Sequence, residues 1–331
     1  MKPPQFENIY SIENLNTAWH KVSLGKSGKP SIIDFYCHLD SNLQSISKDL
    51  QNNTYLPGSY KRFLITDPKK RIISASTVRD RVVQHALMNH YEGIFDRHLI
   101  FDCYACRVGK GTHQAILRAF HFAKSSDYFL KMDVQKYFDS IDHATLKNML
   151  LKMIKDKKAF DLFSNIIDSS KIYEEKGLPI GNLTSQFFAN HYLSSFDHYF
   201  KEQSYARKYI RYMDDILVFS NSKNELKVIY DNALKYTNEK LKLNIKLPVI
   251  DTVNNGVPFL GFLVKPNGIY LQQKTKKRYK VRIANIEHKR KIGAYSDLEA
   301  GRRVESVTAH LLIARSIKFR NNVLYRHIHG V

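Results

Sequence analysis

The sequence predicts an α+β fold, with a body of mixed helices and short strands followed by a basic helical lobe. The body is predicted because short apolar runs that end at turn residues alternate with longer segments of helical periodicity. The lobe is predicted because residues 274–291 contain nine Lys and Arg but one acid, Glu287. No repeat or Pro/Gly-rich linker interrupts the 331 residues, so we expect these parts to be continuous.

Helices and one strand pair are predicted in the N-terminal third. One helix is expected over residues 35–51, where apolar residues recur at helical spacing at Phe35, Leu39, Leu43, Ile46 and Leu50. The stretch FLITDPKKRIISA (63–75) predicts two short strands around an Asp-Pro turn. A helix is expected over 77–95, with Thr77 as its cap and one face formed by Val82, Val83, Ala86, Leu87 and His90.

Strands and helices continue to alternate beyond residue 125. A strand begins at Tyr128, and its alternation places Lys131 and Asp133 on one side together with Phe129. The other predicted elements are helices over 143–168, within 177–200 after a Gly/Pro/Asn-containing loop, and over 307–319, and strand pairs over 209–219 and, with a central glycine, 257–264.

Two adjacent aspartates stand between apolar runs in YIRYMDDILVF (209–219). Asp214 and Asp215 could simply form an exposed hairpin tip, where Asp tolerates positive φ. However, Asp133 also ends an apolar strand, and two such strands side by side would gather three carboxylates. Like charges at that spacing are costly unless a cation binds. Two Mg²⁺ ions about 4 Å apart on three carboxylates suit in-line phosphoryl transfer.

The charge balance favours a polyanionic partner. Lys and Arg total 52 and Asp and Glu total 31, which leaves 52 − 31 = +21. Such an excess of positive charge repels itself unless a polyanion such as nucleic acid binds. The alternative is that the charge only keeps the protein soluble. In the lobe the basic run lies beside Tyr270, Tyr279 and Tyr295, a combination that favours a grip on nucleic acid over a merely solvated face.

Several other classes are disfavoured. The sequence contains no run of 18 apolar residues, so no transmembrane helix is predicted. The N-terminus lacks the apolar core of a secretory signal. We therefore expect no membrane association and a cytoplasmic location. Three cysteines are too few for a disulfide framework. Cys103 and Cys106 have CxxC spacing, but no second pair completes a zinc site, so buried thiols are the favoured interpretation.

Several stretches resemble the sequence blocks of reverse transcriptases, in that family's order. Tyr212-Met213-Asp214-Asp215 resembles the family signature, and MDVQKYFDSID (132–142) is similar to its first catalytic strand. The other similar blocks are DPKKRIISASTVRDRVVQHAL for the fingers, YACRVGKGTHQA for the next block, GLPIGNLTSQFFAN for the template-side loop and FLGF (259–262) for the primer grip. Together these cover roughly residues 60–265.

The resemblance implies a right-hand polymerase with an antiparallel palm sheet and a helical thumb. The implied domains are N-terminal helices and fingers (1–125), a palm (126–265) with a helical insertion at about 143–176, and a basic thumb (266–331). The implied activity is RNA-directed DNA polymerase, with template RNA, a primer or cDNA strand and dNTPs as partners. It would use two Mg²⁺ ions, for which Mn²⁺ can substitute, held by Asp133, Asp214, Asp215 and the Val134 carbonyl.

The resemblance also assigns substrate contacts. Nucleotide-binding positions match Lys69, Lys70, Arg71, Phe138, Ile180 and Gly181. Arg71 suits phosphate because its guanidinium is a planar fork. Phe138 matches a steric gate against the ribose 2′-hydroxyl, the alternative being an ordinary core aromatic residue. Template or primer positions match Asn182, Ser185, Gln186, Tyr212, Met213, Phe259, Leu260 and Gly261.

One departure from the family pattern narrows the resemblance. Ile180 stands where most relatives have glutamine, and the resulting form I-G-x-x-x-S-Q resembles reverse transcriptases of diversity-generating retroelements. These copy a template RNA with errors at adenines, and in mutagenic retrohoming the cDNA replaces part of a target gene. Losing the glutamine hydrogen bond costs about 1 kcal/mol and could narrow discrimination, although Ile180 could instead fill an apolar gap. The subclass implies a small, basic, helical, oligomeric accessory protein and a bacterial, archaeal or phage-encoded origin.

Three alternatives stay open. A group II intron- or retron-type reverse transcriptase is nearest, and because the chain stops at Val331 we expect no maturase or endonuclease extension. A catalytically silent nucleic-acid-binding scaffold would not need the three acids. A nucleotide hydrolase is disfavoured, because His20 stands where a phosphate loop before GKS (25–27) requires glycine.

Overall fold

The chain folds into two compact units, each assembled from three separate segments. The computed structural model describes residues 4–67, 69–169, 175–203 and 206–329. Unit 1 comprises Met1–Phe101, Val134–Tyr199 and Leu234–Ile245. Unit 2 comprises Asp102–Asp133, Phe200–Ala233 and Lys246–Val331. The chain passes repeatedly between the units, and its division into fingers, palm and thumb stays a prediction.

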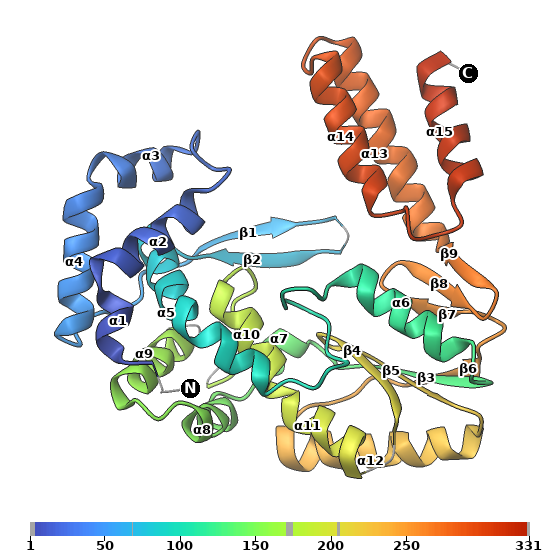
Figure 1. The fold of residues 1–331 in the computed structure, drawn as a ribbon, viewed down its shortest axis with the longest axis horizontal. Helices are drawn as coiled ribbons and strands as arrows, with labels where there is room; N and C mark the ends of the chain where they lie inside the picture. The colour runs from blue at the N-terminus through green and yellow to red at the C-terminus, as the bar shows by residue number, and fades with distance from the viewer. Residues whose placement is uncertain (1–3, 68, 170–174, 204–205, 330–331) are drawn as a thin grey trace. The chain divides into compact units, whose positions relative to one another are not determined.

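Unit 1 is mainly helical and contains one strand pair. Its helices are α1 (Phe6–Tyr10), α2 (Ile12–Ser23), α3 (Pro30–Cys37), α4 (Leu39–Gln51), α5 (Val78–Arg97), α7 (Tyr137–Ser140), α8 (His143–Met153), α9 (Lys157–Asp168), α10 (Leu183–Tyr192) and α11 (Ser194–His198) (Figure 1). Helix α5 is central, because it contacts α1 to α4 and α10. Thr77 caps it as predicted, since its hydroxyl accepts the N–H of Asp80. The predicted strands form the antiparallel hairpin β1 (Lys61–Ile65) and β2 (Arg71–Ala75).

Two of the helices predicted before residue 200 are interrupted. The prediction of a single helix over 35–51 is wrong, because the backbone of His38 leaves helical geometry (φ −123°, ψ 34°) between α3 and α4. There the Asn42 side chain donates to the carbonyl of Phe35 (3.1 Å), which stabilises the end of α3. The long helix expected within 177–200 is divided into α10 and α11, and a short π-helix, Tyr199–Gln203, follows.

Unit 2 contains two antiparallel sheets. The four-stranded sheet has the order β4-β5-β3-β6, formed by β3 (Tyr128–Asp133), β4 (Lys208–Tyr212), β5 (Asp215–Ser220) and β6 (Val249–Thr252). The three-stranded sheet consists of β7 (Val257–Phe259), β8 (Phe262–Lys265) and β9 (Gly268–Leu271) in chain order. Both predicted strand pairs, over 209–219 and 257–264, are thereby confirmed.

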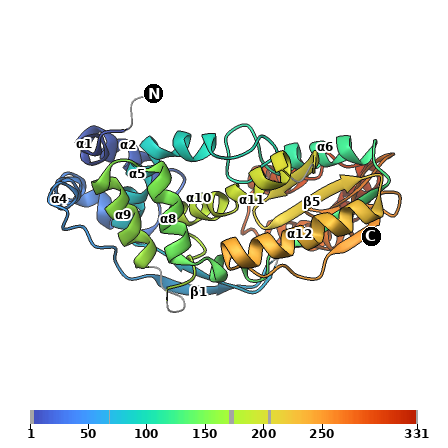
Figure 2. The same cartoon turned by 90° about the horizontal axis from the view of Figure 1, so that it is seen from below.

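Helices cover both faces of the four-stranded sheet. Helix α6 (Thr112–Ala123) contacts β4 and β5, and Figures 1 and 2 show the first part of α12 (Lys223–Leu241) along the opposite face. A continuous apolar core joins α6 to both sheets and includes the buried aromatic residues Phe122, Phe129, Phe219, Phe259 and Phe262. This core supports the strand ends at which the aspartates lie.

Three C-terminal helices form a bundle in unit 2. Helix α13 (Gln273–Lys291) packs against α14 (Asp297–Ala309) and α15 (Ile317–His329) (Figure 1). The prediction of a helix over 307–319 is wrong, because the chain turns between α14 and α15. In this turn the Arg315 N–H donates to the Ile269 carbonyl (2.8 Å). Among the described residues, no helix is long and apolar enough to cross a membrane.

Candidate active site

Three aspartates lie at neighbouring strand ends of the four-stranded sheet. Asp133 is the last residue of β3 and Asp215 the first of β5, and the antiparallel register makes them direct partners. Residues paired in this way have Cβ atoms roughly 4.5–5.5 Å apart. Asp214 lies in the turn between β4 and β5, and all three side chains are half-buried. The register therefore gathers acids from two distant parts of the chain.

The β4–β5 turn is tight, and a buried arginine holds it. Tyr212 pairs with Asp215, so Met213 and Asp214 are the turn residues. The positive φ expected of an aspartate belongs instead to Met213 (53°). Arg211 is fully buried and donates from Nη1 to the Met213 carbonyl (3.1 Å). Sequence reasoning missed Arg211, although a charged residue within an apolar strand was the available signal.

Two lysines offset part of the negative charge. Lys131 Nζ lies 2.9 Å from Asp215 Oδ1, which agrees with the predicted alternation that puts Lys131 on the side of Asp133. Lys246 Nζ lies 2.5 Å from Asp133 Oδ1, a pairing that the sequence did not predict. Burial raises the pKa of Asp214, the charges of Asp133 and Asp215 raise it further, and Lys246 opposes this effect. A further positive charge beside Asp214 would therefore favour its ionised form.

The donor set suits a hard divalent cation, but it is not a preformed metal centre. Within the described residues, no group of three or more His, Cys, Asp or Glu side chains is arranged to hold a metal ion. Carboxylate oxygens are nevertheless the ligands that Mg²⁺ prefers, and a bound cation relieves repulsion of the kind that raises the pKa of Asp214. Val134, the predicted carbonyl ligand, is buried and forms a β-bridge with Ile245. Asp133, Asp214 and Asp215 could hold a cation once the ammonium groups of the two lysines are displaced.

The predicted triphosphate contacts lie on the β1–β2 hairpin in unit 1. Lys69 and Lys70 precede β2, and Arg71 is its first residue. All three residues are exposed. The hairpin therefore presents three cationic side chains to solvent, and their contact with a triphosphate stays a prediction.

The template-side loop docks on β2. The Ile180 carbonyl accepts the N–H of Ser74 (2.9 Å). Gly181 has a φ of 119°, and an added Cβ would lie 2.9 Å from Ile73 Cγ2, so glycine is required for this approach. The carbonyl of Phe138 accepts the Leu178 N–H (2.8 Å). The fold thus joins three segments, around Ser74, Phe138 and Ile180, that the sequence assigned separately to the nucleotide.

The start of α10 carries three predicted template contacts. Asn182 is the N-cap residue of α10, is buried, and donates to the hydroxyl of Tyr60 (3.0 Å). Ser185 is also buried, whereas Gln186 is exposed. Among these three side chains, the outward-facing one is Gln186.

The remaining predicted primer contacts lie on two hairpin turns of unit 2. Phe259 pairs with Phe262, so Leu260 (φ 48°) and Gly261 (φ 90°) form the β7–β8 turn. The Thr275 hydroxyl donates to the Gly261 carbonyl (2.6 Å) and ties this turn to α13. Phe259 is fully buried and supports the turn from the core. At the β4–β5 turn, the hydroxyl of Tyr212 accepts a hydrogen bond from Thr112 (3.2 Å).

Comparison with known proteins identifies the family of the chain. Residues 65–264, more than half of the chain, match the profile of a family described as reverse transcriptase (RNA-dependent DNA polymerase). Protein YkfC of Escherichia coli is 25% identical over 266 residues, covering 66% of this chain and 70% of that protein.

Two intron-encoded proteins are also similar. A putative COX1/OXI3 intron 2 protein of Saccharomyces cerevisiae is 24% identical over 291 residues, and covers 68% of this chain. The group II intron-encoded protein LtrA of Lactococcus lactis is 25% identical over 167 residues, and covers 48% of this chain. The matched regions span 34% and 28% of these two relatives, so the chain corresponds to about a third of their length.

A solved structure of apo telomerase from Candida tropicalis has a similar fold. Its TM-score is 0.53 at 13% sequence identity, covering 90% of this chain and 63% of that chain. At this identity the likeness concerns the fold alone, which is a mixed helix and sheet arrangement.

Proposed function

This chain belongs to the reverse transcriptase family, and we propose that it synthesises DNA on an RNA template with Asp133, Asp214 and Asp215 as its catalytic carboxylates. The observation that carries the proposal is the β3–β5 register, which sets Asp133 opposite Asp215, with Asp214 in the adjoining turn. Family membership supports template RNA, a primer or cDNA strand and dNTPs as the partners.

In this proposal the three carboxylates, with the Val134 carbonyl, would hold two Mg²⁺ ions, or Mn²⁺ in their place. Bound there, the cations would lower the pKa of the attacking 3′-hydroxyl and neutralise the triphosphate. The chain's own contribution is to aim the carboxylates. Arg211 holds the turn that carries Asp214, while strand pairing fixes Asp133 and Asp215.

Residues of unit 1 would bind the incoming nucleotide. Arg71, with Lys69 and Lys70, is exposed and suited to the triphosphate oxygens. Phe138 is half-buried, and its backbone is bonded to the template-side loop, which suits a steric gate against a ribose 2′-hydroxyl. Gln186 would contact the template strand through its exposed side chain.

We further propose that the enzyme belongs to the class that serves diversity-generating retroelements. The supporting observation is Ile180 in the motif I-G-x-x-x-S-Q, where most relatives carry glutamine. The Ile180 carbonyl accepts the N–H of Ser74 in β2, so the backbone is held whichever side chain stands there. In this proposal the side chain at position 180 would face the incoming nucleotide. The isoleucine side chain is stiff and has no polar atom, so it cannot form the hydrogen bond of the glutamine. Mutagenic copying at template adenines, and a small basic accessory protein, are parts of this proposal.

The polymerase proposal is tested with Asp214→Asn. The substitution keeps the size of the side chain but removes a carboxylate, so we expect Mg²⁺-dependent primer extension on RNA to fall by several orders of magnitude while RNA binding stays unchanged. Asp231→Asn, at an exposed position of α12, is the matched control and should retain activity. Full-length cDNA from Asp214→Asn would refute the assignment.

The subclass is tested with Ile180→Gln. We expect the restored amide to lower the error frequency at template adenines severalfold, measured by sequencing cDNA from both forms. Ile180→Leu, which stays apolar, should keep the wild-type error spectrum. If wild-type cDNA carries no excess of errors at adenines, the chain is instead a polymerase of the intron type, and the polymerase assignment survives.

A further inference from the structure

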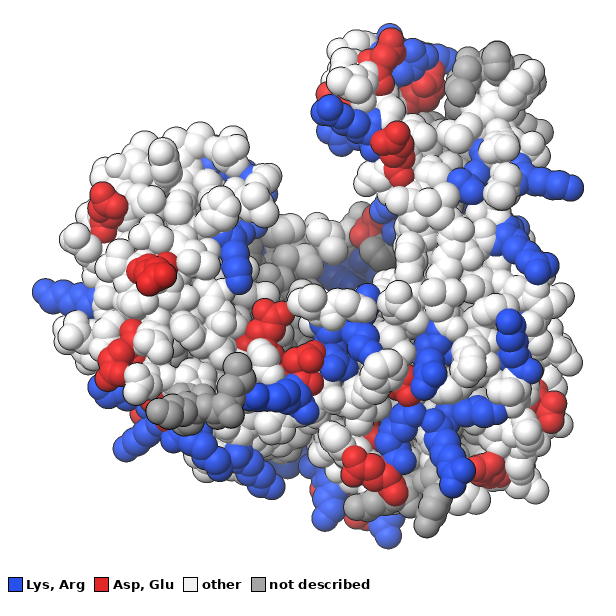
Figure 3. All heavy atoms as spheres, viewed as in Figure 1, with Lys and Arg blue, Asp and Glu red and all other residues white. Residues whose placement is uncertain are grey.

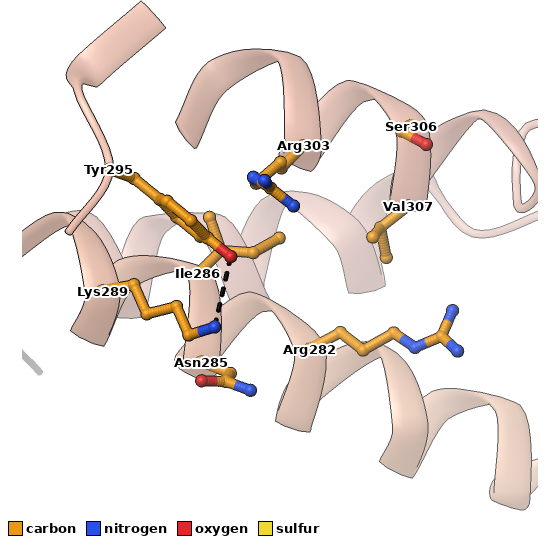
Figure 4. Close-up of a pocket in the computed structure, with 8 residues that line it drawn as sticks. All are labelled: Arg282, Asn285, Ile286, Lys289, Tyr295, Arg303, Ser306 and Val307. Atoms are coloured by element: carbon orange, nitrogen blue, oxygen red, sulfur yellow. Dashed lines mark hydrogen bonds between the residues drawn. The ribbon is translucent and has the colours of Figure 1, made fainter. Parts of the chain in front are cut away.

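A recess lies between α13 and α14 in the C-terminal bundle. It has a volume of about 250 Å³, and none of the three aspartates lines it (Figure 4). A double helix is far too wide for a space of this size, whereas a single nucleotide is not. The recess is therefore suited to a small group or to one unit of a chain.

The lining is cationic, and no carboxylate contributes to it. Lys289 is half-buried, and within the described residues its ammonium has the Tyr295 hydroxyl as its polar partner (3.2 Å). Arg303 stacks above the same ring, with Cζ 4.1 Å from the ring centroid, and pairs with Glu299 outside the recess (2.8 Å). Arg282 adds a third positive charge. No carboxylate of the described residues is paired with Lys289, and Figure 4 shows its ammonium pointing to the Tyr295 hydroxyl.

Other lining groups are apolar or neutral. Ile286 of α13 and Val307 of α14 are half-buried, and with the Tyr295 ring they provide apolar surface. Asn285 and Ser306 are exposed and carry an amide and a hydroxyl. Cations bind phosphate, apolar and aromatic surface accepts the face of a base, and amides and hydroxyls can bond a base edge. These are the groups that recognise a nucleotide.

We propose that this recess binds one unstacked nucleotide of single-stranded RNA, with the phosphate on Lys289 and the base against Tyr295. Bases of a duplex are stacked and paired, so only a single strand can place one in such a recess. A strand is favoured over a free nucleotide because α13, which forms one wall, carries nine Lys and Arg over residues 274–291, and a continuing backbone can contact them. The site goes beyond the polymerase reaction, because it would hold RNA outside the copied duplex.

The test compares Lys289→Gln and Tyr295→Ala with Lys291→Gln in the full-length protein. Lys291 is exposed on the same helix and does not line the recess. Fluorescence anisotropy measures the affinity for a short single-stranded RNA and for an RNA duplex over a salt series. We expect Tyr295→Ala to weaken single-strand binding about tenfold. Lys289→Gln should reduce the slope of log affinity against log salt by about 0.7, while duplex binding stays as in the wild type.

Three results would overturn the proposal. Equal losses of single-stranded RNA affinity from Lys289→Gln and Lys291→Gln would mean that the RNA is attracted by the overall charge of α13 and not by the recess. Displacement of the RNA by AMP or by polyglutamate at comparable concentration would mean a site for free nucleotides or for acidic peptides. All measurements are repeated in an Asp214→Asn background, so that failure of this site and failure of the polymerase proposal are read separately. Retained duplex binding and circular dichroism show that each variant is folded.

Discussion

At the scale of single residues, two buried polar side chains have consequences for the fold. Arg211 is fully buried beneath the β4–β5 turn and bonds the carbonyl of Met213, whose left-handed backbone is otherwise unfavourable. His191 of α10 is likewise buried, with 4% of its surface exposed, and its ring meets those of Phe95 and His98 edge-on. Burial, followed by the nearby His98, lowers the pKa of His191 to about 4.

The lowered pKa of His191 predicts that the folded state loses stability in acid. The unfolded chain binds a proton at His191 below its ordinary pKa of about 6.5, whereas the folded chain excludes it down to about 4, so stability is lost as pH falls through this window. Between pH 7 and pH 4 the wild type should lose about 3 kcal/mol more unfolding free energy than His191→Phe. Urea unfolding at both pH values measures the difference. His38→Phe, at an exposed position, is the control, and an equal acid-induced loss in His191→Phe would contradict the prediction.

At the scale of elements, unit 1 depends on a contact between the loop at Ile180 and strand β2. The Ile180 carbonyl bonds to Ser74 of β2, and Gly181 lies against Ile73. Sequence motifs identified the loop and the hairpin separately, because each has a local pattern. Their contact was not predicted, because it joins segments far apart in the chain.

Gly181→Ala is expected to disrupt this contact. The new methyl group would lie 2.9 Å from Ile73 Cγ2 on a backbone with φ of 119°, so strain and overpacking together should cost about 2–4 kcal/mol. The Michaelis constant for dNTPs should rise as the loop leaves β2. Gly109→Ala also has positive φ (72°) but meets no atom within 4 Å, so it should cost about 1 kcal/mol of backbone strain alone. Equal losses of unfolding free energy in urea would show that the contact with β2 is unimportant.

At the scale of the whole molecule, positive charge is widespread. The net charge is +21, and Figure 3 shows Lys and Arg over much of the face drawn, with Asp and Glu fewer among them. The charge is therefore not confined to α13, although that helix is its densest run. A distributed charge of this kind favours contact with a phosphate backbone over recognition of one sequence.

RNA binding should therefore depend steeply on salt. If six to ten phosphates are contacted, affinity should fall by roughly 10³–10⁵ between 50 and 200 mM salt. Anisotropy titrations of RNA at constant pH measure this slope. An affinity that stays flat over the range would mean that charge is not the main source of binding.

The sequence by itself determined the features that depend on residues close together in the chain. The hairpin from Lys208 to Ser220, the cap at Thr77 and the basic run of α13 all follow from local alternation, turn chemistry and composition. Only the tertiary structure decided which elements meet. The sequence predicted that Asp133 would lie near Asp214 and Asp215, but the structure decided the register that makes Asp133 and Asp215 direct partners. The ion pair of Asp133 with Lys246, the contact of Gly181 with Ile73, and the breaks at His38 and before α15 could not be predicted in this way. These features depend on packing and hydrogen bonds between distant segments, and local propensity contains no information about those partners.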